Sequence, residues 1–157
     1  MLTLSREDFR IRVANFDLTK SHNVLRILVG ALMFPHAASK FAAGGLSAGT
    51  VGFFAKAGIQ PAEFMVGFAA FSEIAIGIAL VLGICTRFAG VGAAAVLAIA
   101  SYAVVSVKGL GWTWNTGGIE YNVVWAILGL LVAMDAWKEH VRTARPVTKH
   151  GFRPAHA

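Results

Sequence analysis

Four long apolar segments constrain this chain more than any other feature of its sequence. They cover residues 23–43, 61–82, 88–107 and 119–136. Each is close to the roughly 20 residues that an α-helix needs to cross a hydrocarbon core about 30 Å thick. Only 14% of the residues are charged, whereas soluble domains have about 25%, so a soluble protein of this size could not cover its surface. We therefore predict an all-α fold, a bundle of four transmembrane helices in the lipid bilayer.

The distribution of basic residues predicts the orientation of this bundle. Ten Lys and Arg side chains flank one side, in the two tails and in the short turn after the second segment, whereas the other side has three. The positive-inside rule then places both termini in the cytoplasm, and four spans return the chain to its starting side. We expect a cytoplasmic segment over residues 1–20, a membrane domain over 21–137 and a basic tail over 138–157. The tails offer few of the interleaved aromatic residues that stack on bases, which argues against nucleic acid as a partner.

The first 20 residues contain a shorter helical pattern. Phe9, Val13 and Phe16 recur at helical spacing, the arginines between them lie on other faces, and Ser5 is a suitable N-cap. This pattern predicts a short amphipathic helix over residues 5–16, lying on the cytoplasmic surface of the membrane. A disordered basic leader is the alternative, and the residues alone do not decide between the two.

Ionisable side chains inside the apolar segments are candidates for function, because charge is costly in hydrocarbon. Glu73 lies near the middle of the second segment and hence near the membrane midplane, so we expect it to be protonated or partnered. His36 and Lys40 are spaced i, i+4 on the first segment and share a face, which makes them the predicted partners. Arg26, nearer the cytoplasmic end, is a second possible partner.

His36, Lys40 and Glu73 are expected to converge with Tyr102 and Glu120 in the outer half of the predicted bundle. A ring of hydrogen-bonding groups in an apolar setting suits a quinone, whose carbonyls need donors and whose reduction needs protons. We predict that Glu73 and His36 exchange the protons and that His36, Lys40, Tyr102 and Glu120 bind the quinone. The same residues are compatible with a buried polar network that only sets helix register, and both interpretations stay open.

Other kinds of site are less well supported. His36 is the only histidine inside a predicted span, and His22 lies about 20 Å away along the same helix, so no metal site is predicted. Cys85 is the single cysteine, which excludes an internal disulfide, and we interpret it as a small apolar residue in a tight turn. The many Gly and Ala residues of the third segment are typical of close helix packing.

Three stretches resemble the DoxX family of small four-helix membrane proteins: LRILVGALMFPHAASKF, FSEIAIGIALVLGICTRFAG and GGIEYNVVWAILGLL. They cover roughly residues 24–135, and Ala37 stands where the family commonly has Gly after the histidine. The resemblance implies association with quinone-linked oxidoreductases, including the small subunit of a thiosulfate:quinone oxidoreductase, and a place in the bacterial inner membrane. The recurring polar positions of the family fall on Arg26, His36, Lys40, Glu73, Arg87 and Glu120, of which we assign structural roles to Arg26 and Arg87.

The leading hypothesis is a membrane subunit of a quinone-linked oxidoreductase system with a quinone as its cofactor. The chain has no flavin, haem or iron–sulfur motif, so another protein subunit is expected to supply the other electron carrier. The alternative is a non-catalytic accessory subunit that packs against a larger membrane complex through its Ala/Gly face. A channel or transporter would need broken paired helices and a polar pathway, and the sequence offers little of either.

Overall fold

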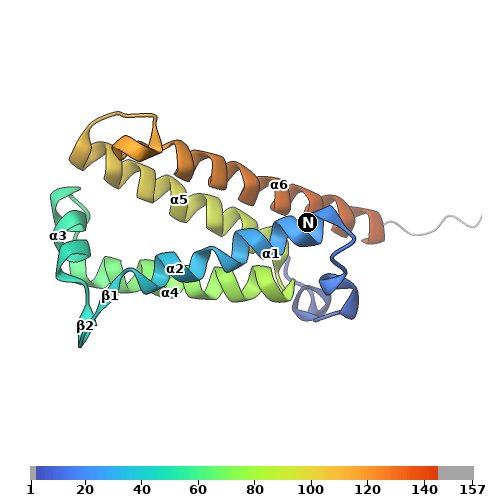
Figure 1. The fold of residues 1–157 in the computed structure, drawn as a ribbon. Coiled ribbons are helices and arrows are strands. Elements are labelled where there is room, and N and C mark those ends of the chain that lie inside the picture. Colours follow the sequence, from blue (N-terminus) through green and yellow to red (C-terminus); the bar gives the residue numbers. More distant parts are fainter. Residues whose placement is uncertain (1–2, 145–157) are drawn as a thin grey trace, which may run out of the picture.

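The computed structural model describes residues 3–144, which fold into a helical bundle (Figure 1). Its long helices are α4 (Ala62–Leu82), α5 (Thr86–Lys108) and α6 (Glu120–Ala144). Two shorter helices in tandem, α1 (Ser21–Ala31) and α2 (Met33–Ala38), pack against α4, and α1 also contacts α6. The smaller elements are η1 (Arg6–Phe9), η2 (Val13–Phe16), β1 (Phe41–Ala42), β2 (Gly45–Leu46), α3 (Ala48–Lys56) and η3 (Trp114–Thr116).

The connections distinguish the two ends of the bundle (Figure 1). We call one the hairpin end, because it has the antiparallel β1–β2 pair, α3 and the Trp-rich loop of residues 109–119. We call the other the turn end, because it has the α4–α5 turn of residues 83–85. The N-terminal segment, residues 3–20, and the last turns of α6 also lie at the turn end. Neither the hairpin nor α3 was predicted from the sequence.

Three helices, α4, α5 and α6, are long and apolar enough to cross a membrane. They confirm the second, third and fourth predicted segments, and α6 continues eight residues beyond its predicted end at residue 136. The basic tail predicted over residues 138–157 is therefore helical as far as Ala144, and its remainder lies outside the described residues. Exposed apolar side chains cover the outside of the bundle, as expected for helices that contact lipid.

The first predicted segment differs from the other three. It is divided between α1, with 11 residues, and α2, with 6, and neither reaches the length of a span. Pro35 lies one turn after Ala31, the last residue of α1, and it has no N–H to donate to the Ala31 carbonyl. The helical part ends at Ala38 instead of the predicted residue 43, so four spans are not confirmed by helix length.

Glycines bring α5 and α6 close together. A Cβ atom on Gly90 would lie 2.6 Å from the Gly129 carbonyl oxygen, and one on Gly129 would lie 3.0 Å from the Gly90 carbonyl oxygen. Ala93 and Ala94 are buried on the same side of α5. The predicted packing role of these small residues is confirmed, but their partner is α6 of the same chain. That part of the Ala/Gly face is therefore not available to another protein.

The N-terminal segment is not the continuous amphipathic helix predicted over residues 5–16. It forms two single 3₁₀ turns, η1 and η2, joined by extended residues, with Ser5 as the N-cap of η1. Its polar groups are bonded to the turn end: the Cys85 N–H donates to the Asp8 carbonyl at 2.6 Å, and the Asn15 side chain donates to the Leu82 carbonyl at 3.1 Å. These long-range bonds override the helical pattern, and Val13 is left 92% exposed.

Candidate functional site

A buried ion pair joins the end of α2 to the middle of α4. The Lys40 ammonium donates to both carboxylate oxygens of Glu73 at 2.7 Å and to the His36 carbonyl oxygen at 3.2 Å. Both side chains of the pair are largely buried. An ammonium has three N–H donors, so these three acceptors use all of them. The carboxylate that sequence reasoning singled out thus faces the bundle interior, and its charge is balanced by Lys40.

The ring of His36 lies among aromatic side chains of α6. It stacks with Tyr121 at 6.2 Å between ring centroids and meets the edge of Trp125 at 4.9 Å. Tyr121 and Trp125 also contact each other at 5.4 Å. The sequence analysis included neither Tyr121 nor Trp125 among the site residues. Their i, i+4 spacing was the available signal, because it puts both rings on one face of a helix.

Trp125 also has an unusual polar atom. The residue is only 3% exposed, and its indole Nε1 has no hydrogen-bond partner within residues 3–144. Buried indole N–H groups usually donate to an acceptor, since an unmet donor in an apolar setting is costly. The Trp125 ring also contacts the ring of His36 at 4.9 Å between centroids. Together they offer N–H groups and flat apolar rings in one place.

The structure does not bring Tyr102 or Glu120 into this group. Tyr102 is 58% exposed on α5, and within the described chain it makes no hydrogen bond or ring contact with His36, Lys40 or Glu73. Glu120 starts α6 and accepts a hydrogen bond from the Trp114 backbone N–H at 3.3 Å. The Glu120 side chain is therefore bonded to the Trp-rich loop.

Arg26 lies at the turn end and does not pair with Glu73, so that alternative is wrong. Its guanidinium donates to the carbonyl oxygens of Leu80, Val81 and Asn15. The first two belong to the last turn of α4, whose carbonyls have no partners within the helix. Arg26 therefore joins the end of α4 to the N-terminal segment.

Arg87 also has a structural position at the turn end. The residue is 2% exposed, and it donates to the Asp8 carboxylate at 2.9 Å and to the Thr3 carbonyl at 2.8 Å. Its guanidinium lies 4.7 Å from the ring centroid of Phe88. Burial by itself raises the pKa of Asp8, but hydrogen bonds from Ser5 and the charge and hydrogen bond of Arg87 outweigh it and lower the pKa. Asp8 is therefore ionised at neutral pH, which keeps the buried pair intact.

Cys85 is in the α4–α5 turn, as predicted, with a positive φ of 47°. Burial and the negative charge of Asp8 raise the pKa of its thiol, although Arg87 acts in the opposite direction. The thiolate is the reactive form, so this environment disfavours nucleophilic chemistry. Within residues 3–144 there is no group of three His, Cys, Asp or Glu side chains placed to hold a metal ion.

Comparison with known proteins identifies the family. A family model, DoxX, matches residues 22–106 of the 157-residue chain. The chain belongs to the DoxX family. No curated protein and no solved structure matches it. The matched residues contain the Lys40–Glu73 pair and His36, whereas Tyr121 and Trp125 on α6 lie outside them. This DoxX protein is thus a membrane protein with several apolar helices.

Proposed function

We propose that this DoxX protein is a membrane subunit of a quinone-linked oxidoreductase system, with the quinone ring beside His36, Tyr121 and Trp125. The observation that carries the proposal is the Trp125 indole N–H, which is buried and lacks a partner in the described chain, on a ring that contacts the His36 ring. A quinone carbonyl is an acceptor for such a donor. Membership of the DoxX family associates the chain with membrane oxidoreductase systems.

Each residue has a distinct part in this proposal. A bound quinone supplies the capacity to take up two electrons and two protons. The Trp125 N–H would donate to a carbonyl oxygen of the quinone, and the His36 imidazole would hold or release a proton beside it. The rings of Tyr121 and Trp125 would hold the flat headgroup and limit access of water. The electrons come from a second protein.

The ion pair is assigned a positioning role. Lys40 has all three N–H donors in use, one of them on the His36 backbone carbonyl, so it fixes where His36 lies. Glu73 accepts from Lys40 with both carboxylate oxygens, which makes it an anchor for the chain at the end of α2. We accordingly narrow the quinone site to His36, Tyr121 and Trp125, without Tyr102 or Glu120.

The test is the quinone content of the full-length protein purified in mild detergent from bacterial membranes. Trp125→Phe removes the N–H but keeps an aromatic ring, and it should lower quinone occupancy about five-fold, the effect of one lost hydrogen bond. His36→Gln should lower it by a similar factor. Tyr102→Phe is the control, because this exposed hydroxyl is outside the site. Absence of quinone from the wild type, or equal content in all variants, would contradict the proposal.

A non-catalytic accessory subunit is the second candidate. The complete pairing of Lys40 with Glu73 and the His36 carbonyl favours it, because a saturated polar network fixes helix register without any ligand. The exposed face of α5 is then the docking surface. Ala98→Leu on that face should release a partner complex with quinone content unchanged, whereas Ala94→Leu is buried against α6 and should harm folding instead.

We also propose that α1 and α2 together cross the bacterial inner membrane, with both termini in the cytoplasm. Residues 21–38 form one nearly continuous helical stretch, since Leu32 between the two helices keeps a right-handed helical backbone. Eighteen residues rise about 27 Å, close to the hydrocarbon thickness. Reporter fusions should read inside, outside, inside, outside and inside after Lys20, Ala48, Arg87, Gly111 and Ala157. An outside signal at the C-terminus would overturn this topology.

A further inference from the structure

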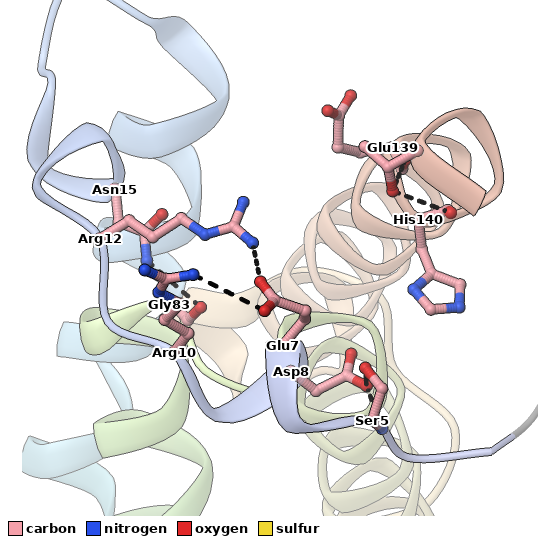
Figure 2. Close-up of polar contacts among 10 residues, drawn as sticks. Ser5, Glu7, Asp8, Arg10, Arg12, Asn15, Gly83, Glu139 and His140 are labelled. Carbon is pink, nitrogen blue, oxygen red and sulfur yellow. Dashed lines mark hydrogen bonds and ion pairs between the residues drawn. The ribbon is translucent and has the colours of Figure 1, made fainter. Parts of the chain in front are cut away.

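At the turn end, an open groove of about 810 Å³ lies between the N-terminal segment and the last turns of α6. Figure 2 shows Glu7, Arg10 and Arg12 on one side of this region and Glu139 and His140 of α6 on the other. The groove is within the range of small-molecule sites, about 300–1,000 Å³. Seven Lys or Arg residues line it against four Asp or Glu residues, so its lining has an excess of three positive charges.

One of these cations is buried and is not balanced by a carboxylate. Arg26 is 4% exposed, and within residues 3–144 all its hydrogen bonds go to neutral backbone carbonyls. Two of the carbonyls end α4, where the helix dipole contributes about half a negative charge. A buried positive charge is unfavourable unless it is compensated. Arg26 is also one of the residues that line the groove, so its uncompensated charge favours an anion there.

Other cations of the groove are exposed and only loosely paired. Arg12 contacts Glu7 at 2.6 Å and Arg142 contacts Glu139 at 2.6 Å, but more than half of each arginine side chain is exposed. Exposed ion pairs contribute little, about 0–1 kcal/mol, so both arginines can exchange a carboxylate for a stronger anion at small cost. Lys138 is exposed on the same turns of α6 and has no ion-pair partner in the described chain.

We propose that this groove binds a phosphate-bearing anion, with Arg12 and Arg142 on its two sides and Arg26 at its base. Arginine donates two parallel N–H groups to phosphate oxygens, which suits the two exposed guanidiniums. The groove lies at the ends of α4 and α6 and the start of α5, where helices that cross a membrane meet its surface. Basic pockets in such places recognise anionic lipid headgroups, and a free polyphosphate presents the same chemistry. The site is independent of the quinone proposal, because it is at the opposite end of the bundle.

The experiment uses the full-length protein in nonionic detergent with two probes. Phosphatidylglycerol binding is measured by native mass spectrometry against phosphatidylcholine, and sodium pyrophosphate binding by calorimetry. The groove variant is Arg12→Gln with Arg142→Gln, and the control is Lys56→Gln with Lys108→Gln, which removes two cations from the hairpin end. Each cation near an anionic headgroup is worth about five-fold in affinity, so the groove variant should bind about 30-fold more weakly and the control as the wild type does.

The outcomes separate the two sources. Binding of phosphatidylglycerol alone, lost in the groove variant, supports the site with lipid as its ligand. Binding of pyrophosphate with the same dependence on the arginines supports it with a soluble anion. The proposal is overturned if neither probe binds, if phosphatidylcholine binds equally well, or if both double variants lose binding to the same extent. Should the groove variant fail to fold, Lys138→Gln alone should weaken binding about five-fold, and an unchanged affinity would overturn the proposal.

Discussion

Each end of this DoxX protein contains one buried ion pair, and the two pairs have different uses. Lys40 and Glu73, 33 residues apart, join neighbouring helices of the membrane domain near the hairpin end. Arg87 and Asp8, 79 residues apart, attach a segment that is not part of any long helix to the turn end. In the first pair, the three N–H groups of Lys40 all donate to acceptors of the protein, two on Glu73 and one on the His36 carbonyl. The second is one contact in a network of backbone carbonyls, aromatic rings and further arginines.

The surroundings of the two pairs also predict different ligands. Next to Lys40 and Glu73 the charges cancel, and the remaining polar groups are N–H donors between aromatic rings, which suit a neutral planar molecule. At the turn end the charges do not cancel, because the lining of the groove has more cations than carboxylates. A buried ion pair therefore indicates a ligand site only where the surrounding residues have unbalanced charge or hydrogen-bond donors without a partner.

The largest expected effect is at the hairpin end. Glu73→Leu leaves the buried Lys40 ammonium with only the His36 carbonyl and should lower the free energy of unfolding by about 3–5 kcal/mol. Glu73→Gln, which keeps an acceptor oxygen, should lose less. Unfolding by sodium dodecyl sulfate, followed by circular dichroism, measures both. Lys40→Met with Glu73→Leu removes the whole pair and should recover most of the stability, whereas a double variant as unstable as Glu73→Leu would contradict the pairing.

The next effect is at the turn end. Asp8→Ala should lower the free energy of unfolding by about 3 kcal/mol, at the low end for a broken buried pair, because Arg87 keeps the Thr3 carbonyl and the Phe88 ring. Glu7→Ala is the matched control, since its partner Arg12 is exposed, and it should change stability by less than about 1 kcal/mol. Thermal unfolding in detergent compares the two. Equal losses of stability in the two variants would show that the Asp8–Arg87 pair stabilises the fold no more than an exposed ion pair does.

A smaller effect is expected where α5 and α6 meet between the two ends. Gly90→Ala puts a methyl group 2.6 Å from the Gly129 carbonyl oxygen and should cost about 1–3 kcal/mol through overpacking. Gly52→Ala on α3 is the control, because nothing lies within 4 Å of its Cβ position. Alanine there should stabilise the helix by about 0.5–1 kcal/mol. The same unfolding assay measures both, and a neutral Gly90→Ala would mean that the helices separate easily.

The smallest effect is a pH dependence confined to the turn end. The pKa of Asp8 is lowered in the folded protein, so its contribution to stability is complete above the ordinary value of 3.8 and disappears as the pH falls through the lowered folded pKa. The difference in melting temperature between wild type and Asp8→Ala should therefore be constant near neutral pH and should shrink below pH 3.8. A difference that stays constant under acid conditions would contradict the Asp8–Arg87 pair as its cause.

Local sequence patterns predicted most of the fold. The bounds of α4 and α5 agree with the predicted segments within two residues, because Pro61 directly precedes α4, Gly83 follows it and Gly109 follows α5. The first segment shows the limit of this reasoning. Its apolar content predicted one span, but Pro35 removes a backbone donor and divides the helix, and the residues after Ala38 form a hairpin.

The candidate site was predictable only in part. The i, i+4 spacing of His36 and Lys40 and the midplane depth of Glu73 were sufficient to bring these three residues together. Tyr102 and Glu120 were placed in the same half of the bundle by depth alone, and depth does not say which way a side chain faces. Trp125 was missed because it is not ionisable, and its significance comes from an indole N–H that the packing leaves without a partner.

By itself the sequence determined that this chain is a helical membrane protein. The length of each apolar segment and its scarcity of charge can be read from the local sequence, and a hydrocarbon core requires both. Only the tertiary structure decided which acceptors Lys40 and Arg26 use and where His36 lies. It also decided that the N-terminal segment folds as two 3₁₀ turns bonded to the α4–α5 turn. The physical reason is that these contacts join residues far apart in the chain, and their geometry follows from how the helices pack and not from any spacing along the sequence.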